Sequence, residues 1–220
     1  MIHHVVNNKL LISVAPRAGT HTITDVMKNI PHHEELVRSR VPIHNVAGQD
    51  LKRVKFVRNP YTRAVSSYYV FVNNPRLKLY EKVGMDRREA RGTSFLEYLR
   101  IMFHVDMSET NIHIRNQETY YNGGYLKYNE VRKIENIKDE IQDVLRYADV
   151  SVNPEDLENG NVRGKTSYGG KVFDMPMAKM VLEGHWPVVP EYHEFYNDET
   201  ADLVSRIYSG DLYDYEVPTA

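Results

Sequence analysis

A short segment near the N-terminus combines residues that could bind an anion. Lys9 to Ala15 reads KLLISVA, and this apolar run predicts a buried strand. Apolar residues at helical spacing predict a helix over residues 20–30. The turn between them reads PRAGT, and the N-terminus of a helix favours negative charge through its N–H groups and its dipole. Arg17 adds a full positive charge, so the turn predicts a phosphate-sized anion site. The alternative is an ordinary turn with an exposed arginine.

A second segment places an arginine after a second predicted strand, residues 54–57. Asn59 is a suitable N-cap and Pro60 suits the first turn of a helix that we predict to reach residue 72. Because α/β sheets bind ligands at the carboxyl ends of their strands, we expect Arg58 at such a ligand site. Ser66 lies two helical turns further on, and arginine with serine can hold a phosphate by hydrogen bonds.

Histidine is the side chain best suited to take a proton from a hydroxyl near neutral pH. Of the ten histidines most must be bystanders; His44 lies fourteen residues before Arg58 and is a candidate for a general base. Alternatively, His44 is a polar loop residue without a catalytic role. His113 is the rival candidate, and we expect His21 to pack at the start of the first helix.

Together the two segments resemble the sulfotransferases that use 3′-phosphoadenosine 5′-phosphosulfate (PAPS). That family pairs a Pro-Lys-x-Gly-Thr loop with an Arg-Asn-Pro-x-x-Arg-x-x-Ser motif. This chain has PRAGT at residues 16–20 and RNPYTRAVS at residues 58–66. The first segment departs from the family pattern by arginine for lysine at position 17, which keeps the charge but changes its geometry.

The resemblance implies PAPS as the sulfuryl donor and assigns a role to each matching residue. Arg17 would face the leaving group, and His44 would be the base, since family members carry theirs in this place. The expected site for the 5′-phosphosulfate comprises Arg17, Ala18, Gly19, Thr20, His21 and Thr22. That for the 3′-phosphate comprises Arg58, Ser66, Arg163, Gly164 and Lys165.

Residues 111–117 (NIHIRNQ) look like the His-x-x-x-Gln stretch of the carbohydrate sulfotransferase branch. The likeness implies that His113 and Gln117 bind the acceptor, a hydroxyl of a sugar. The C-terminal part from Phe195 to Tyr215 is similar to the closing helix and tail of the same branch.

The remaining pattern predicts helices over residues 94–104, 136–147 and 198–208, the last capped by Asp198, and an irregular stretch over residues 73–91. Strands alternating with helices predict an α/β fold. We expect a P-loop-like three-layer fold with a central, mostly parallel sheet flanked by helices, formed as one sulfotransferase domain over residues 1–220.

Composition limits the alternatives. A net charge of -2 gives no general field for nucleic acid, and the absence of cysteine removes disulfides and thiolate chemistry. No apolar run reaches membrane-span length, and none near the N-terminus matches a signal peptide, so we expect a soluble, cytoplasmic protein. No zinc-ligand spacing occurs, so we expect no metal. A nucleotide-dependent kinase would need a Walker A lysine that the turn lacks. A non-catalytic anion- or glycan-binding module on the same fold is the other alternative.

Overall fold

The computed structural model describes residues 1–74, 76–106, 111, 113–118, 120, 121, 124–153, 165, 166, 169–180, 189–212 and 215–218. The chain forms two compact units. The first comprises residues 1–58 and 117–161, and the second comprises residues 59–116 and 162–220. The single domain expected over residues 1–220 stays a prediction.

A five-stranded sheet forms the centre of the first unit, in the order β3-β1-β2-β4-β7. β2 is parallel to β4, and β4 is parallel to β7, whereas β1 runs antiparallel to both of its neighbours. Four strands therefore share one direction, which confirms the mostly parallel sheet. The bounds are β1 Ile2–Val6, β2 Leu10–Val14, β3 Val37–Ser39, β4 Lys52–Val57 and β7 Glu130–Lys133.

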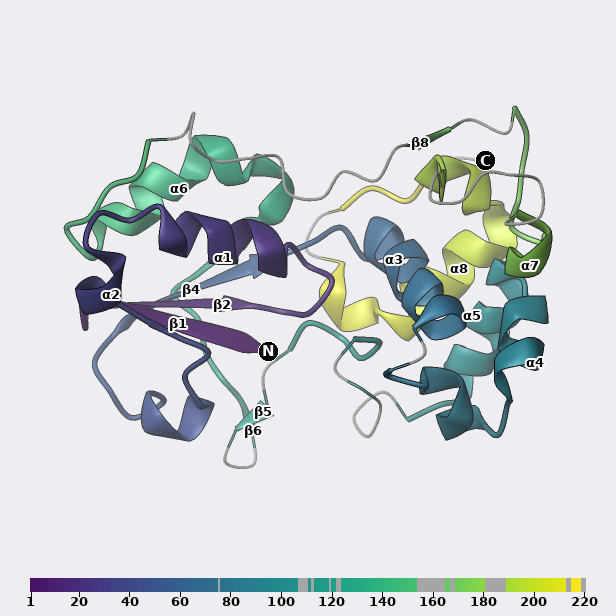
Figure 1. Cartoon of the computed structure of the whole chain (residues 1–220), viewed down its shortest axis with the longest axis horizontal. Coiled ribbons are helices and arrows are strands. Elements are labelled where there is room, and N and C mark those ends of the chain that lie inside the picture. Colours follow the sequence, from purple (N-terminus) through teal and green to yellow (C-terminus); the bar gives the residue numbers. More distant parts are fainter. Residues whose placement is uncertain are drawn as a thin grey trace. The chain divides into compact units, whose positions relative to one another are not determined.

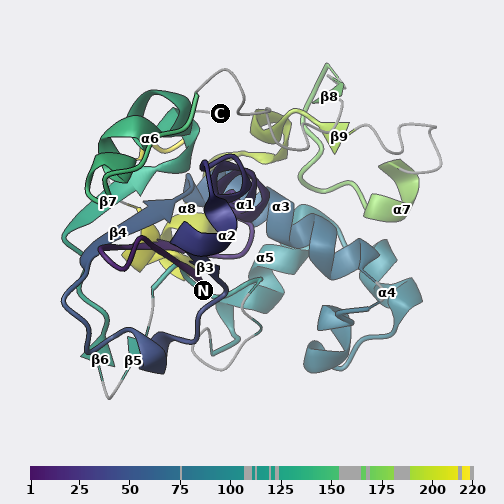
Figure 2. The ribbon, with the colours of Figure 1, turned by 60° about the vertical axis from the view of Figure 1, so that its left-hand side comes forward.

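Helices cover one face of this sheet. α1 (Thr20–Lys28) and α6 (Ile137–Arg146) lie on the same side of the strands (Figure 1). Side chains alternate along a strand, so Val54 and Phe56 of β4 pack toward these helices. Seen from the side, β7 lies next to β4 with α6 above them (Figure 2). On the opposite face the segment of residues 41–51 packs against the sheet, with Val46 and Leu51 buried beside strand residues.

Three of the five strands, β1, β3 and β7, are not predicted by the sequence pattern. β1 (IHHVV) contains two histidines, and β7 (EVRK) is mostly polar, so neither has an apolar run. The remaining elements of the first unit are the short helices α2 (His33–Leu36), η1 (Ile43–Asn45) and η3 (Ile134–Asn136) and the two-stranded pair β5 (Tyr120–Tyr121) and β6 (Gly124–Tyr125).

The second unit is mainly helical. Its helices are α3 (Pro60–Asn73), η2 (Leu79–Val83), α4 (Arg87–Gly92), α5 (Phe95–Phe103), α7 (Met177–Met180), η6 (Tyr192–Phe195), α8 (Asp198–Ile207) and η7 (Ser209–Asp211), and β8 (Lys165–Thr166) pairs with β9 (Val189–Pro190). The core is aromatic: Tyr68 of α3, Phe95 of α5 and Phe195 of η6 meet edge to face.

Local hydrogen bonds explain where these helices begin. The Asn59 side chain accepts from the N–H groups of Tyr61 and Thr62, which confirms it as the cap of α3. Ser94 and Glu97 form the predicted capping box of α5. The predicted cap of α8 was wrong by one residue, since the Asn197 side chain accepts from the N–H of Thr200. The stretch of residues 73–91, expected to be irregular, contains η2 and most of α4.

Candidate active site

The turn between β2 and α1 contains two residues with left-handed backbone conformation. Arg17 has a φ of 68°, and Gly19, which caps α1, has a φ of 85°. A Cβ at Gly19 would lie 2.2 Å from Cγ1 of Ile134, so the position requires glycine both for its backbone and for its space. Ile134 therefore closes one side of the turn, and the backbone enters α1 directly from the end of β2.

The first turn of α1 contains no acidic residue. The turn itself therefore supplies no carboxylate to the partial positive charge of the N-terminal N–H groups. The Thr20 hydroxyl donates to the carbonyl of Ala15 at 3.2 Å and ties the helix back to the strand. Ala18 is buried, Thr22 is half-buried and His21 is exposed.

Arg58 lies at the same edge of the sheet as this turn. β2 and β4 are parallel neighbours, with Val14 opposite Phe56. The segments that follow the two strands therefore leave the sheet side by side. Nη1 of Arg58 donates to the carbonyl oxygen of Arg17 at 3.0 Å. The structure thus brings together the two arginines that the sequence assigned to two ends of one ligand.

Gln117 also belongs to this group. Its Oε1 accepts from the backbone N–H of Arg58 at 2.9 Å, and its Nε2 donates to the backbone carbonyl of Arg58 at 3.0 Å. The Gln117 side chain is fully buried. The sequence suggested that Gln117 binds the acceptor. In the structure its amide is bonded to the backbone of Arg58, and its side chain has no exposed surface.

The sequence pattern did not predict the buried polar residues Lys55, Ser13 and His3, which lie side by side on three neighbouring strands. Lys55 of β4 is 1% exposed, and its Nζ lies 3.1 Å from Oε1 of Glu118. Ser13 is opposite Lys55 in the sheet register, and His3 is opposite Ser13 with its Nδ1 2.8 Å from the serine Oγ. A lysine within the apolar run of β4 was the one sequence signal for these residues.

His44 lies in the segment between β3 and β4. It is exposed on η1 (Ile43–Asn45), and the residues that follow it are held by Arg53 near the start of β4. Nη2 of Arg53 donates to the carbonyls of Ala47 and Gln49 at 2.6 and 3.2 Å. Arg58 follows the opposite end of that strand. The assignment of His44 as base stays a prediction.

Within the second unit, α3 holds the segment that contains His113. The buried Arg63 donates to the carbonyl of Arg115 at 2.5 Å and lies 3.7 Å from the buried carboxylate of Asp211. The Ser67 hydroxyl donates to the carbonyl of His113 at 2.9 Å. Ser66, by contrast, is half-buried and keeps part of its surface open, as a ligand-binding residue requires.

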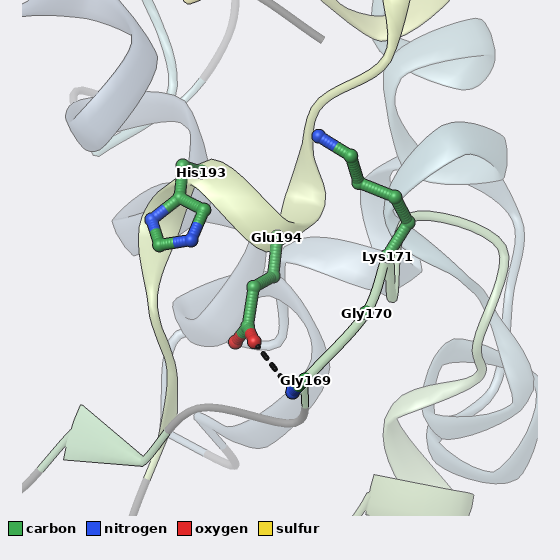
Figure 3. A pocket seen from close by; sticks show the side chains of 5 residues that line it. All are labelled: Gly169, Gly170, Lys171, His193 and Glu194. Atoms are coloured by element: carbon green, nitrogen blue, oxygen red, sulfur yellow. Dashed lines mark hydrogen bonds between the residues drawn. The ribbon is translucent and has the colours of Figure 1, made fainter.

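The predicted basic loop is described only in part. Arg163 and Gly164 lie outside the described residues, and Lys165 is described only as backbone in β8. A cavity of about 330 Å³ lies close by in sequence, lined by Gly169, Gly170, Lys171, His193 and Glu194 (Figure 3). The Glu194 carboxylate accepts from the N–H groups of Gly169 and Glu191. His193 lies on one side of Glu194 and Lys171 on the other (Figure 3).

The described residues contain neither a cluster of metal ligands nor a membrane-spanning helix. No group of three or more histidine, aspartate or glutamate side chains there could hold a metal ion. None of the described helices is long and apolar enough to cross a membrane.

Comparison with known proteins agrees with the geometry at the end of β2 and β4. A family model described as "Sulfotransferase family" matches residues 9–215, which span parts of both units. Comparisons with curated proteins and with solved structures give no match. The matched region covers the turn of Arg17, the RNPYTRAVS motif and the segment of Gln117, and the chain therefore belongs to the sulfotransferase family.

Proposed function

We propose that this protein transfers a sulfuryl group from PAPS to a hydroxyl of a carbohydrate acceptor. The observation that carries the proposal is the contact between Arg58 and the Arg17 carbonyl, made where two parallel strands end beside the N-terminus of α1. Two arginines and a helix N-terminus without acidic residues in its first turn, all at one sheet edge, suit a ligand with two separate anionic groups. PAPS is such a ligand.

The residues fit PAPS without a metal. The turn of residues 17–22 would hold the 5′-phosphosulfate through its N–H groups and Arg17, because the positive φ angles of Arg17 and Gly19 curve the backbone there. Arg58 would hold the 3′-phosphate. Ser66 and residues 163–165 are assigned to the same phosphate by the resemblance alone.

PAPS supplies a sulfuryl group whose S–O bond to the 5′-phosphate breaks as the acceptor oxygen bonds to sulfur. Arg17 then faces the phosphate oxygen on which charge develops, and a fixed cation there stabilises the transition state more than the ground state. A histidine receives the acceptor proton. His44 and His113 are the two candidates, and the exposed ring of His44 is open to an acceptor from outside.

The first test is calorimetry with the product nucleotide, 3′-phosphoadenosine 5′-phosphate, with and without Mg²⁺. We expect binding that needs no metal. Arg58→Ala should weaken it by about 2–4 kcal/mol, the scale for removing one partner of a buried charge pair. The matched control is Arg146→Ala, since Arg146 is exposed on α6. Binding that requires Mg²⁺, or an Arg58→Ala protein that binds as wild type, would refute the nucleotide assignment.

A second test identifies the acceptor and the base. A panel of hydroxyl compounds incubated with PAPS is analysed by mass spectrometry for a sulfated product, and sugars are expected to react. Nucleotide binding without transfer to any acceptor would favour a non-catalytic module instead. Replacing the true base should lower turnover by about 10²–10⁴-fold with nucleotide affinity retained. Comparing His44→Ala with His113→Ala therefore decides between the two histidines.

A further inference from the structure

We infer that Gln117 is a positioning residue for Arg58, fixing the backbone from which the 3′-phosphate is bound. The inference rests on the proposed function. Gln117 would then not bind the acceptor directly. It would instead be the reason why Arg58 lies where it does.

The geometry of the contact supports this role. The Gln117 amide satisfies both backbone groups of Arg58, at 2.9 and 3.0 Å, as a neighbouring strand would at one step of a ladder. Arg58 is the first residue after β4, where regular pairing with β7 has ended at Val57. Gln117 thus extends the backbone support of the sheet by one residue, to the arginine that needs it.

Burial makes this support rigid. The Gln117 side chain has no exposed surface, and a buried amide that lost its partners would cost free energy. Only one orientation of the amide works, because the N–H of Arg58 must meet the oxygen and the carbonyl must meet the nitrogen. The pair therefore fixes the path of the backbone at Arg58 as well as its hydrogen bonds.

The next residue anchors Gln117 from the sheet side. Glu118 pairs at 3.1 Å with Lys55, whose side chain is almost fully buried three residues before Arg58. Residues 117 and 118 therefore contact β4 and its end through two separate side-chain interactions. A carboxylate facing a buried cation is costly to remove, which keeps this register in place.

From that fixed backbone the Arg58 side chain reaches the Arg17 carbonyl at 3.0 Å. A change in backbone direction at Arg58 would displace the guanidinium from both the turn and the phosphate. Because a misplacement of about 1 Å can cost on the order of 10²-fold, the loss of Gln117 should weaken nucleotide binding although Gln117 does not touch the nucleotide.

A double-mutant cycle read by calorimetry with 3′-phosphoadenosine 5′-phosphate tests the inference. Gln117→Met keeps the volume of the side chain and removes both hydrogen bonds. In the wild-type background we expect about 10- to 100-fold weaker binding. In the Arg58→Ala background the same change should cost less than about twofold, because the residue through which Gln117 acts is already gone. The matched control is Gln142→Met on α6, which should bind as wild type.

Equal losses in the two backgrounds would mean that Gln117 contacts the ligand directly, and an unchanged affinity in the wild-type background would mean that it has no role in binding. Either result overturns the inference about Gln117. The proposed function is tested separately, by nucleotide binding to the wild type. Wild-type protein that binds no nucleotide overturns both. Urea unfolding monitors the fold of each variant. If Gln117→Met does not fold, Gln117→Glu replaces it in the cycle, since a carboxylate still accepts from the Arg58 N–H but cannot donate to the Arg58 carbonyl and repels it.

Discussion

Acid should destabilise this protein through two histidines buried in β1. His3 is 5% exposed and His4 is 1% exposed, and burial lowers the pKa of each from 6.5 to about 4. The neighbouring N-terminal amino group further lowers the pKa of His3, and Arg40 that of His4. Nδ1 of His4 lies 2.9 Å from the Ser39 hydroxyl, and its buried Nε2 has no hydrogen-bond partner among the described residues. The folded chain thus holds both rings neutral.

The size and direction of the effect follow from these values. An unfolded histidine binds a proton as the pH falls below 6.5, whereas the folded ones resist until about pH 4. Stability is therefore full above pH 6.5 and falls as the pH drops toward 4. Between pH 7 and pH 5 each histidine should lower the free energy of unfolding by about 2 kcal/mol. Hydrogen bonds from Lys52 and Tyr147 lower the pKa of Glu130 from 4.5 to about 2, so the stability that this carboxylate contributes is lost only below about pH 4.5.

Urea unfolding followed by circular dichroism at pH 7, 6 and 5 and constant ionic strength measures the loss. His3→Asn and His4→Asn keep a polar atom near the position of Nδ1 and remove the titration, so each should flatten the pH dependence by about half. His33→Asn is the matched control, since His33 is exposed in α2. If the double variant loses as much stability between pH 7 and pH 5 as the wild type, the reasoning from burial is wrong.

Three further outcomes are expected. Gly19→Ala should lower the free energy of unfolding by about 1–3 kcal/mol, because the position has a positive φ and the new methyl group clashes with Ile134. Urea unfolding measures this loss, and part of it should be recovered in an Ile134→Ala background. Arg63→Met should cost about 3–5 kcal/mol in the same assay, because it removes the buried cation that faces the buried carboxylate of Asp211, and Asp211→Asn added to it should recover part of that loss. Arg17→Ala should lower sulfuryl transfer by about 10²-fold with a smaller change in nucleotide affinity, and Arg17→Lys should keep much of the activity; an effect confined to KM would contradict its place at the leaving group.

Local chemistry made part of this structure readable from the sequence. The strand, turn and helix around Gly19 follow from an apolar run, a glycine and a helical spacing within twenty residues of one another. The start of α3 follows from Asn59 and Pro60, and that of α5 from Ser94 and Glu97, since each cap bonds to N–H groups two or three residues away. The family pattern at residues 58–66 is equally local.

Tertiary structure decided what depends on partners distant in the chain. β1 is buried although two of its five residues are histidines, because Ser13 and Ser39 lie opposite to receive them. The need for glycine at position 19 comes partly from Ile134, which is remote in the sequence. Gln117 meets Arg58 across 59 positions of the chain, so no spacing rule could pair them. Hydrogen bonds between residues close in the chain can be predicted from the order of residues. Burial and pairing between distant residues arise only when the sheet has formed.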